Sequence, residues 1–241
     1  MTAIYHAIIT QPLLNILIFF YNTIAFRDLG ASIILLTIFV RLILFPVFKK
    51  SAEYQLAMQV IQPKLKAVQE KHKEDKTKQT EAMLALYREH KLNPFSGFLF
   101  LLIQLPILIG LYRIFLFHLK PGGFNDLYSF IAAPASLNTT LLGLINLNEK
   151  SIILVIVAAA LQYVQARISI RKNKGGTMSD AEKTSRYMAF VAPVLTLVIF
   201  ANLPAAVSLY WSVASAFSIV QQVFINKQFE KWELEMNSLK K

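Results

Sequence analysis

Five apolar runs of about 20 residues dominate this sequence, and none of them contains Asp or Glu. An α-helix rises 1.5 Å per residue, so runs of this length can cross the roughly 30 Å hydrocarbon layer of a bilayer. Of the 241 residues, 55% are hydrophobic and only 16% are charged, which is more apolar than a soluble core of that size needs. The sequence therefore predicts an all-α membrane protein with five transmembrane helices, at residues 29–48, 94–117, 151–170, 187–203 and 204–226.

The distribution of Lys and Arg predicts the orientation of these helices. Residues 49–91 carry ten basic residues, 171–186 carry five and 227–241 carry four, against two in 118–150 and one before residue 29. Cytoplasmic loops are enriched in Lys and Arg. We therefore expect a cytoplasmic loop at 171–186, a cytoplasmic tail at 227–241 and an extracytoplasmic loop at 118–150, with the N-terminus outside. This topology explains the net charge of +11 without a nucleic-acid partner.

Residues 1–28 are apolar but carry polar residues on one helical face, at Gln11, Asn15 and Asn22. We interpret this segment as an extracytoplasmic interfacial helix. The alternative is a sixth transmembrane helix, which would place both termini on the same side of the membrane.

Residues 49–93 predict an amphipathic helical hairpin in the cytoplasm, with a polar turn at 73–76. Pro63 is expected at a helix start, where its missing N–H is harmless. The alternative is a solvated charged loop. Apolar residues recur at helical spacing on both sides of the turn, at Ile61, Leu65 and Val68 and again at Met83, Leu84 and Tyr87.

The sequence contains no arrangement of residues that is typical of catalysis. There is no cysteine, the four histidines are scattered along the chain, and no metalloprotease or phosphate-binding motif is present. Carboxylates are confined to the segments outside the apolar runs, which argues against an intramembrane protease. We expect a protein that binds and guides other molecules, not an enzyme, with no cofactor or metal.

Arg41 is the most informative residue, because it lies about 10 Å inside the cytoplasmic end of the first predicted span. A charge at this depth costs at least a few kcal/mol, and no predicted span supplies an Asp or Glu to pair with it. Either a hydrated cavity solvates Arg41 or its side chain snorkels back to the interface. The sequence alone leaves both interpretations open.

Polar residues in the predicted spans favour a hydrated cavity. Thr37 lies one turn from Arg41, and Tyr210 and Trp211 lie about two turns inside the last span. Each residue has a simpler alternative role, as an interhelical hydrogen-bonding group or as core packing. The other candidates for the cavity lining are Gln104, Gln162, Ser208, Ser212 and Ser215.

The order of several short motifs resembles the YidC/Oxa/Alb family of membrane protein insertases, over residues 22–226. The motifs are Thr37-Ile38-Phe39-Val40-Arg41 with Pro46, Gln62-Pro63-Lys64, Ala85-Leu86-Tyr87, Asn93-Pro94, Leu101-Leu102-Ile103-Gln104-Leu105-Pro106-Ile107 with Leu111-Tyr112, Leu203-Pro204, Leu209-Tyr210-Trp211 and Gln221-Gln222.

This resemblance implies a five-helix core around a hydrophilic groove in the bacterial plasma (inner) membrane. Arg41 is expected at the centre of the groove, with Thr37, Gln104, Gln162, Tyr210 and Trp211 along the substrate path. The expected partners are nascent membrane-protein clients and the lipid bilayer, with the ribosome or the Sec translocon as further candidates. The large extracytoplasmic domain of Gram-negative forms and the lipobox cysteine of many Gram-positive forms are missing from this sequence.

Two other classes of function compete with insertion. A small-molecule or anion transporter could use Arg41 to bind its substrate, although the chain lacks the repeated halves that many transporters show. A structural assembly factor would hold helices together through faces of small residues, for which only the Ala-rich run at 151–170 offers a hint.

Overall fold

The computed structural model describes residues 2–90, 92–93, 96–119, 122–170 and 180–238. Helices make up most of this part of the chain, and a two-stranded antiparallel sheet is the exception to the all-α prediction. Two helical segments, η1 and η2, are π-helical. The elements are α1 (Thr2–Tyr5), η1 (His6–Thr10), α2 (Gln11–Thr23), α3 (Leu29–Ile43), α4 (Phe45–Lys71), α5 (Lys76–Glu89), α6 (Ser96–Arg113), η2 (Ile114–His118), β1 (Thr140–Leu141), β2 (Ile145–Asn146), α7 (Ile152–Ser169), α8 (Asp180–Phe200) and α9 (Ala205–Ser238).

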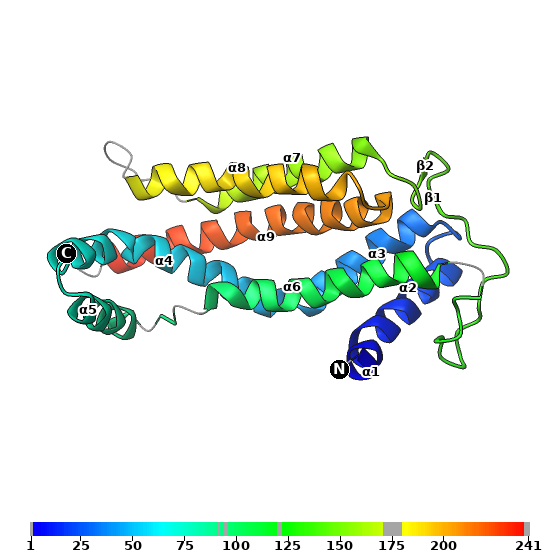
Figure 1. Ribbon diagram of the computed structural model, residues 1–241, viewed down its shortest axis with the longest axis horizontal. Coiled ribbons are helices and arrows are strands. Elements are labelled where there is room, and N and C mark those ends of the chain that lie inside the picture. Colours follow the sequence, from blue (N-terminus) through cyan, green and yellow to red (C-terminus); the bar gives the residue numbers. More distant parts are fainter. Residues whose placement is uncertain (1, 91, 94–95, 120–121, 171–179, 239–241) are drawn as a thin grey trace.

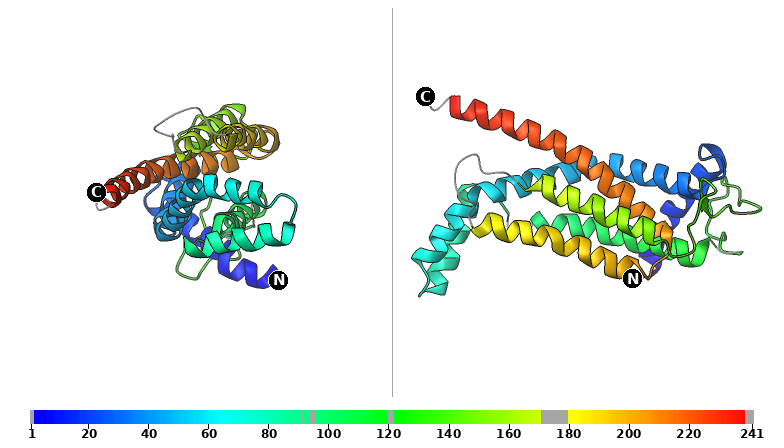
Figure 2. Two further views of the ribbon diagram at one scale, coloured as in Figure 1. Left: turned by 90° about the vertical axis from the view of Figure 1, so that its left-hand side faces the viewer. Right: turned by 90° about the horizontal axis from the view of Figure 1, so that it is seen from above.

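The helices form an elongated bundle (Figure 1). Helix α7 packs against both α8 and α9, and α3 packs against α9 and α2. The α4–α5 pair lies at one end of the bundle and the β1–β2 hairpin lies at the other (Figure 1). Seen from above, α9 extends beyond the bundle at its C-terminal end (Figure 2). The helix continues to Ser238, so the predicted tail at 227–241 begins as part of α9.

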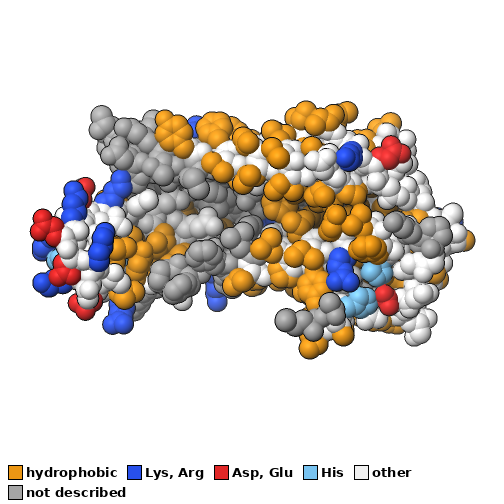
Figure 3. All heavy atoms as spheres, in the orientation of Figure 1, with side chains coloured by type: hydrophobic (Ala, Val, Ile, Leu, Met, Phe, Trp, Pro, Cys, Tyr) orange, Lys and Arg blue, Asp and Glu red, His pale blue; other side chains and the backbone are white. Residues whose placement is uncertain are grey.

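The surface of the middle of the bundle is apolar. Large hydrophobic side chains on α7 and α8 point outward, including Ile153, which is 64% exposed, and Val198, which is 65% exposed. Figure 3 shows hydrophobic side chains over the middle of this face and Lys, Arg, Asp and Glu gathered at the α4–α5 end. Contiguous exposed apolar surface of this kind fits contact with lipid acyl chains.

Each predicted run overlaps a helix over most of its described residues, but the count of five spans is not confirmed. Within the described residues, three helices are long and apolar enough to cross a membrane, at Ala3–Thr23, Ile152–Ser169 and Ala205–Gln228. A bent pair, α3 with α4, is a fourth candidate. Leu102–His118 and Phe190–Phe200 are shorter apolar helices. Residues 94–95, at the start of the second predicted span, and 171–179, in the predicted loop at 171–186, lie outside the described residues.

The residues of the first predicted span, 29–48, are divided between two helices. Helix α3 ends at Ile43, and α4 starts at Phe45 with its axis bent by 67°. The physical reason is Pro46 in the first turn of α4. Its ring nitrogen has no hydrogen to donate to the carbonyl of Leu42, and its ring would clash with that carbonyl in a straight helix. Residues 45–48 of the predicted span thus form the first turn of α4, the helix that continues into the predicted hairpin at 49–93.

The hairpin itself consists of α4 and α5, joined by residues 72–75. Pro63 lies inside α4, which corrects the expectation that it starts a helix. Ile61 and Leu65 are buried as the apolar spacing predicts, whereas Leu84 on α5 is 43% exposed. The Asp75 side chain caps α5 by accepting a hydrogen bond from the Lys78 backbone N–H at 3.0 Å.

The N-terminal helix lies along the loop that follows η2. Its predicted polar face is the contact surface: Gln11 and Asn15 donate side-chain hydrogen bonds to the Asp126 carbonyl, at 3.2 and 3.0 Å, and Asn22 donates to the Ala132 carbonyl at 2.8 Å. The segment is long and apolar enough to span a membrane. Its assignment as an interfacial helix is therefore not settled by length and composition.

The β1–β2 hairpin, which the sequence analysis missed, packs against the start of α3. Asp28 caps α3 through the Ala31 N–H at 2.7 Å, and its second carboxylate oxygen accepts a hydrogen bond from the Leu142 N–H at 2.7 Å. Gly30 allows the close approach, because a Cβ at this position would lie 2.8 Å from the Leu141 Cα. One carboxylate and one glycine thus fix the hairpin on the helix.

Candidate functional site

Arg41 lies in the last turn of α3, two residues before the helix ends at Ile43. Its side chain is only 5% exposed. The chain bends at Leu44, and Phe48, in the first turn of α4, lies against the guanidinium. The Arg41 Cζ lies 4.5 Å from the centroid of the Phe48 ring, within the range of a cation–π contact.

A cavity of about 50 Å³ lies beside Arg41. This volume is large enough for about three water molecules. Four helices contribute to its walls, and no carboxylate is among the lining residues. The uncharged polar residues are Ser51 and Gln55 of α4, Gln165 and Ser169 of α7, and Ser218, Gln221 and Gln222 of α9, and the others are Arg41, Phe48 and Ala52.

Side-chain amides next to the cavity hold its helices together. Gln221 donates to the carbonyl of Phe45, at the bend between α3 and α4, at 3.3 Å. Asn226 donates to the Ile168 carbonyl at 2.9 Å, and Gln59 donates to the Ser169 carbonyl at 2.9 Å. The last carbonyls of α7 have no partners within their own helix. The amides of α4 and α9 therefore satisfy them and fix the C-terminal end of α7 beside the cavity.

Arg41 has no acidic partner in the part of the chain that the structure describes. The ion pairs found there involve other basic groups. A buried guanidinium without a counter-ion costs several kcal/mol unless other groups solvate it. The Phe48 ring, the surrounding amide oxygens and water in the cavity can do so. Because the side chain is buried among α3, α4, α7 and α9, its position argues against snorkelling to the interface.

Two other predicted residues meet near Arg41. The Gln104 side chain of α6 donates a hydrogen bond to the Tyr210 hydroxyl of α9 at 2.6 Å, and both side chains are 2% exposed. Tyr210 is also an electrostatic neighbour of Arg41. The helices α6 and α9 thus bring two of the predicted site residues into contact in the bundle interior.

The remaining predicted residues have different environments. Thr37 is buried but donates to the carbonyl of Ile33 in its own helix at 2.6 Å. Gln162 accepts a hydrogen bond from Thr196 of α8, so it links α7 to α8. The Ser208 hydroxyl and the Trp211 indole N–H are buried and make no hydrogen bond to the described part of the chain.

A polar stripe on α9 connects these positions with the cavity. Its residues recur every three or four positions, which places them on one face of the helix. The stripe spans 15 residues from Ser208 to Gln222, or about 21 Å along the helix. It consists of Ser208, Ser212, Ser215, Ser218 and Gln222, and all except Ser218 are buried. The structure therefore extends the polar surface from the cavity toward the other end of the bundle.

The cavity residues of α4 and α7 were not predicted from the sequence. A signal was present in α7, because Gln162, Gln165 and Ser169 follow one another at helical spacing in an otherwise apolar run. No such signal marks Ser51 and Gln55, because polar residues are ordinary in a charged amphipathic helix.

Comparison with known proteins identifies relatives over most of the chain. The model of the 60Kd inner membrane protein family matches residues 19–232. A membrane protein insertase YidC from Pelobacter propionicus is 31% identical over 222 residues, covering 91% of this chain and 39% of the relative. The Geobacter sulfurreducens YidC is 29% identical, covering 94% and 39%. The Fusobacterium nucleatum YidC is 29% identical, covering 83% and 87%. The chain thus spans about two fifths of the Pelobacter and Geobacter proteins.

Proposed function

Because the chain belongs to the 60Kd inner membrane protein family, which is the YidC/Oxa/Alb family, we propose that this multi-pass inner-membrane protein inserts transmembrane segments of client proteins into the bilayer. The observation that carries the proposal is the burial of Arg41, without a carboxylate partner, beside a polar cavity. The partners are nascent membrane proteins and the surrounding lipid. Contacts with the ribosome or the Sec translocon are expected from the family resemblance alone.

The cavity and the polar stripe of α9 support a groove mechanism. Water in such a groove shortens the apolar barrier that a polar flank of the client has to cross. The positive charge of Arg41 attracts acidic groups in that flank at short range, although water in the groove weakens the attraction. The apolar segment of the client then moves into lipid. Its burial supplies the driving force, at about 25 cal/mol per Å² of apolar surface.

The contacts of the N-terminal helix support an interfacial position. Its two ends bond to the same loop, since His6 contacts Asp126 and the Tyr21 hydroxyl accepts a hydrogen bond from the Asn138 N–H. Irregular backbone is not tolerated against lipid within the hydrocarbon layer. A helix bound along its length to such a loop fits the membrane surface better than a sixth span. The positive-inside rule then places the α4–α5 hairpin in the cytoplasm.

The transporter alternative has less physical support. Sites for small molecules usually occupy about 300–1,000 Å³. The cavity beside Arg41 is far smaller, at about 50 Å³. It fits water and the edge of a polar chain better than an enclosed solute.

Insertion into proteoliposomes that contain only this protein tests the proposal. The clients are two single-span proteins that differ only in a neutral or an acidic translocated flank, and insertion is read by protease protection. Arg41→Lys is expected to retain most activity because the charge is kept. Arg41→Ala is expected to impair the acidic client most, and Arg41→Glu to impair it further by repulsion.

Arg167→Ala provides a matched control, since Arg167 also lies in the last turn of an apolar helix but is exposed. Insertion is normalised to folded protein in the membrane. Equal insertion of both clients by wild type and Arg41→Ala would refute the role of Arg41. Failure of the wild-type protein to insert either client would refute the proposed function.

A further inference from the structure

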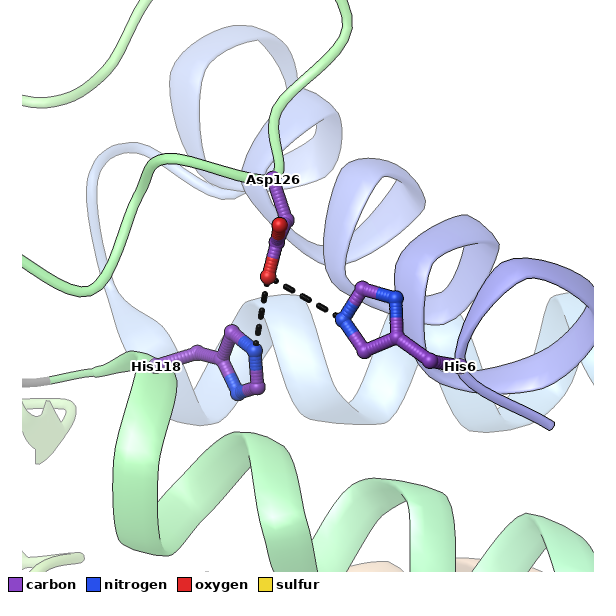
Figure 4. A group of neighbouring side chains, drawn as sticks. All are labelled: His6, His118 and Asp126. Carbon is purple, nitrogen blue, oxygen red and sulfur yellow. Dashed lines mark hydrogen bonds and ion pairs between the residues drawn. The ribbon is translucent and has the colours of Figure 1, made fainter. Parts of the chain in front are cut away.

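Three side chains far apart in the sequence converge at the start of the N-terminal helix. His6 Nε2 lies 3.0 Å from Asp126 Oδ2, and His118 Nε2 lies 3.2 Å from the same oxygen (Figure 4). The sequence analysis treats the histidines as scattered, but the fold brings two of the four together. The three ligand atoms lie within 4.8 Å of one another. This group, His6, His118 and Asp126, is called the His-Asp cluster below.

Local distortions of the helices place both histidines. His6 begins the π-helical segment η1, and His118 ends the π-helical segment η2. Such segments are rare and are often found at functional sites. Asp126 is fixed by its main chain, since Gln11 and Asn15 bind its carbonyl and Asn15 also accepts a hydrogen bond from the Tyr128 N–H at 2.7 Å. The three side chains thus come from η1, η2 and the loop at residue 126. Helix α2 continues from η1 and is hydrogen-bonded to this loop.

Both ring nitrogens of His118 face hydrogen-bond acceptors. Its Nδ1 faces the backbone carbonyl of Arg113 at 3.4 Å, and a carbonyl can only accept. With the ring proton on Nδ1, a neutral imidazole turns the lone pair of Nε2 toward the Asp126 carboxylate, where lone pairs would face each other. Either a second proton on the ring or a metal ion resolves this conflict. An Nδ1–H bonded to a backbone carbonyl is the usual outer contact of a metal-binding histidine.

We propose that the His-Asp cluster is a zinc site with two imidazole ligands and one carboxylate ligand. Nitrogen and oxygen ligands at about 2.0–2.2 Å in a tetrahedron lie roughly 3.3 Å apart, which is close to the two nitrogen–oxygen distances in the cluster. Histidine ligands favour zinc over magnesium or calcium, which prefer oxygen. The third edge, between the two imidazoles, closes by rotation of the side chains. The fourth position is open to water.

The bound ion links the N-terminal helix, the end of η2 and the loop at residue 126. Its role is structural, because it joins elements that lie far apart in the sequence. The proposal is independent of the insertion mechanism, since the cluster shares no residue with the cavity beside Arg41. The absence of cysteine removes thiolates as competing zinc ligands.

Zinc binding to the purified full chain tests the proposal. The protein is prepared without a polyhistidine tag, stripped with a chelator and titrated with Zn²⁺ against a chromophoric indicator. Co²⁺ is used in parallel, because its visible absorption reports tetrahedral nitrogen and oxygen ligands. We expect one equivalent to bind, zinc to raise the melting temperature, and His118→Ala and Asp126→Asn each to weaken binding at least about tenfold.

His72→Ala and His90→Ala are the matched controls, because these histidines lie on the α4–α5 hairpin and should not affect binding. Melting in chelator shows whether each variant is folded. Asp126→Asn keeps the size of the side chain and the main-chain contacts to Gln11 and Asn15. Zinc binding that is absent in the wild type, or that the control variants weaken as much as His118→Ala, would overturn the proposal. A loss of melting temperature in His118→Ala with no effect of zinc on the wild type would identify a hydrogen-bonded staple instead.

Discussion

The Gln104 amide donates a hydrogen bond to the Tyr210 hydroxyl inside the bundle, at 2.6 Å. The bond joins α6 to α9. Both groups are buried, so neither can exchange its partner for bulk water. An unpaired polar group in such a place costs about 1–3 kcal/mol. The bond thus acts as a specific connection between α6 and α9.

The losses of unfolding free energy from the two single substitutions in this pair should add up to more than the loss from the double substitution. Tyr210→Phe leaves the Gln104 amide unpaired, and Gln104→Leu leaves the hydroxyl unpaired. We expect the double variant to be more stable than the sum of the single losses by about 0.6–1.7 kcal/mol, as for hydrogen bonds in other helical membrane proteins. Reversible unfolding in mixed micelles measures this coupling.

The Gln162–Thr196 hydrogen bond is a suitable comparison, because it also joins two helices but Gln162 is only partly buried. Its double-mutant cycle should give a smaller coupling energy. If the losses of unfolding free energy from Gln104→Leu and Tyr210→Phe are strictly additive, the hydrogen bond contributes no specific stability.

Gly30→Ala should destabilise the packing of the β1–β2 hairpin against the start of α3. A Cβ at this position would lie 2.4 Å from the Leu141 Cδ1 and 2.8 Å from its Cα, so backbone has to move. Overpacking of this kind costs about 1–3 kcal/mol. Gly143→Asn is the control in the same hairpin, because nothing lies near its Cβ and Asn tolerates a φ of 74°. A melting temperature of Gly30→Ala equal to that of the wild type would contradict the close approach.

The sequence predicted the helices well and the long-range contacts poorly. The third run, 151–170, coincides with α7 because Ser151 caps its start and the apolar residues continue without a break. The bend at Leu44 was missed because the apolar run continues through it, although Pro46 was the available signal. The cluster of His6 with Asp126 joins residues 120 positions apart. Helical periodicity contains no information about such pairs.

The candidate site was predicted in the same uneven way. Arg41 stood out because a charge in an apolar run is costly. Gln104 and Tyr210 were found as individual polar positions, but their mutual hydrogen bond depends on how α6 packs near α9. Gln55 and Gln165 line the cavity only because α4 bends away from the axis of α3 and α7 packs against α9.

The start of α5 should lose stability in acid through Asp75. The backbone N–H of Lys78, with the Lys78 ammonium second, lowers the pKa of the Asp75 carboxyl from its ordinary value of 3.8. Because the folded pKa is depressed, the carboxylate stabilises the cap above the unfolded pKa, and this contribution disappears as the pH falls through the folded pKa. The rate of amide exchange at residues 76–79, measured at each pH in the wild type and in the Asp75→Asn variant, tests this effect.

Asp75→Asn is the informative variant, because an asparagine side chain can still cap the helix but cannot titrate. Near neutral pH the wild type should be the better protected protein, and the difference should vanish at low pH. Asp75→Ala should exchange faster than both at neutral pH. If the ratio of the exchange rates of wild type and Asp75→Asn stays constant across the acid range, the Asp75 carboxylate is not the source of the extra protection.

The membrane topology can be tested by cysteine labelling, because the chain has no cysteine of its own. The N-terminal helix bonds to the loop at 122–138 near both of its ends, which favours one shared side for residue 2 and this loop. We therefore expect an impermeant maleimide to label Thr2→Cys and Asn125→Cys in right-side-out vesicles. Lys73→Cys, in the hairpin turn, and Lys174→Cys, outside the described residues, should react only after the membrane is permeabilised. Labelling after denaturation provides the reference for each variant.

If Thr2→Cys reacts only after permeabilisation while Asn125→Cys reacts before it, the N-terminal helix is a sixth span. If Lys73→Cys reacts in sealed vesicles, the hairpin lies outside and the orientation deduced from the basic loops is wrong.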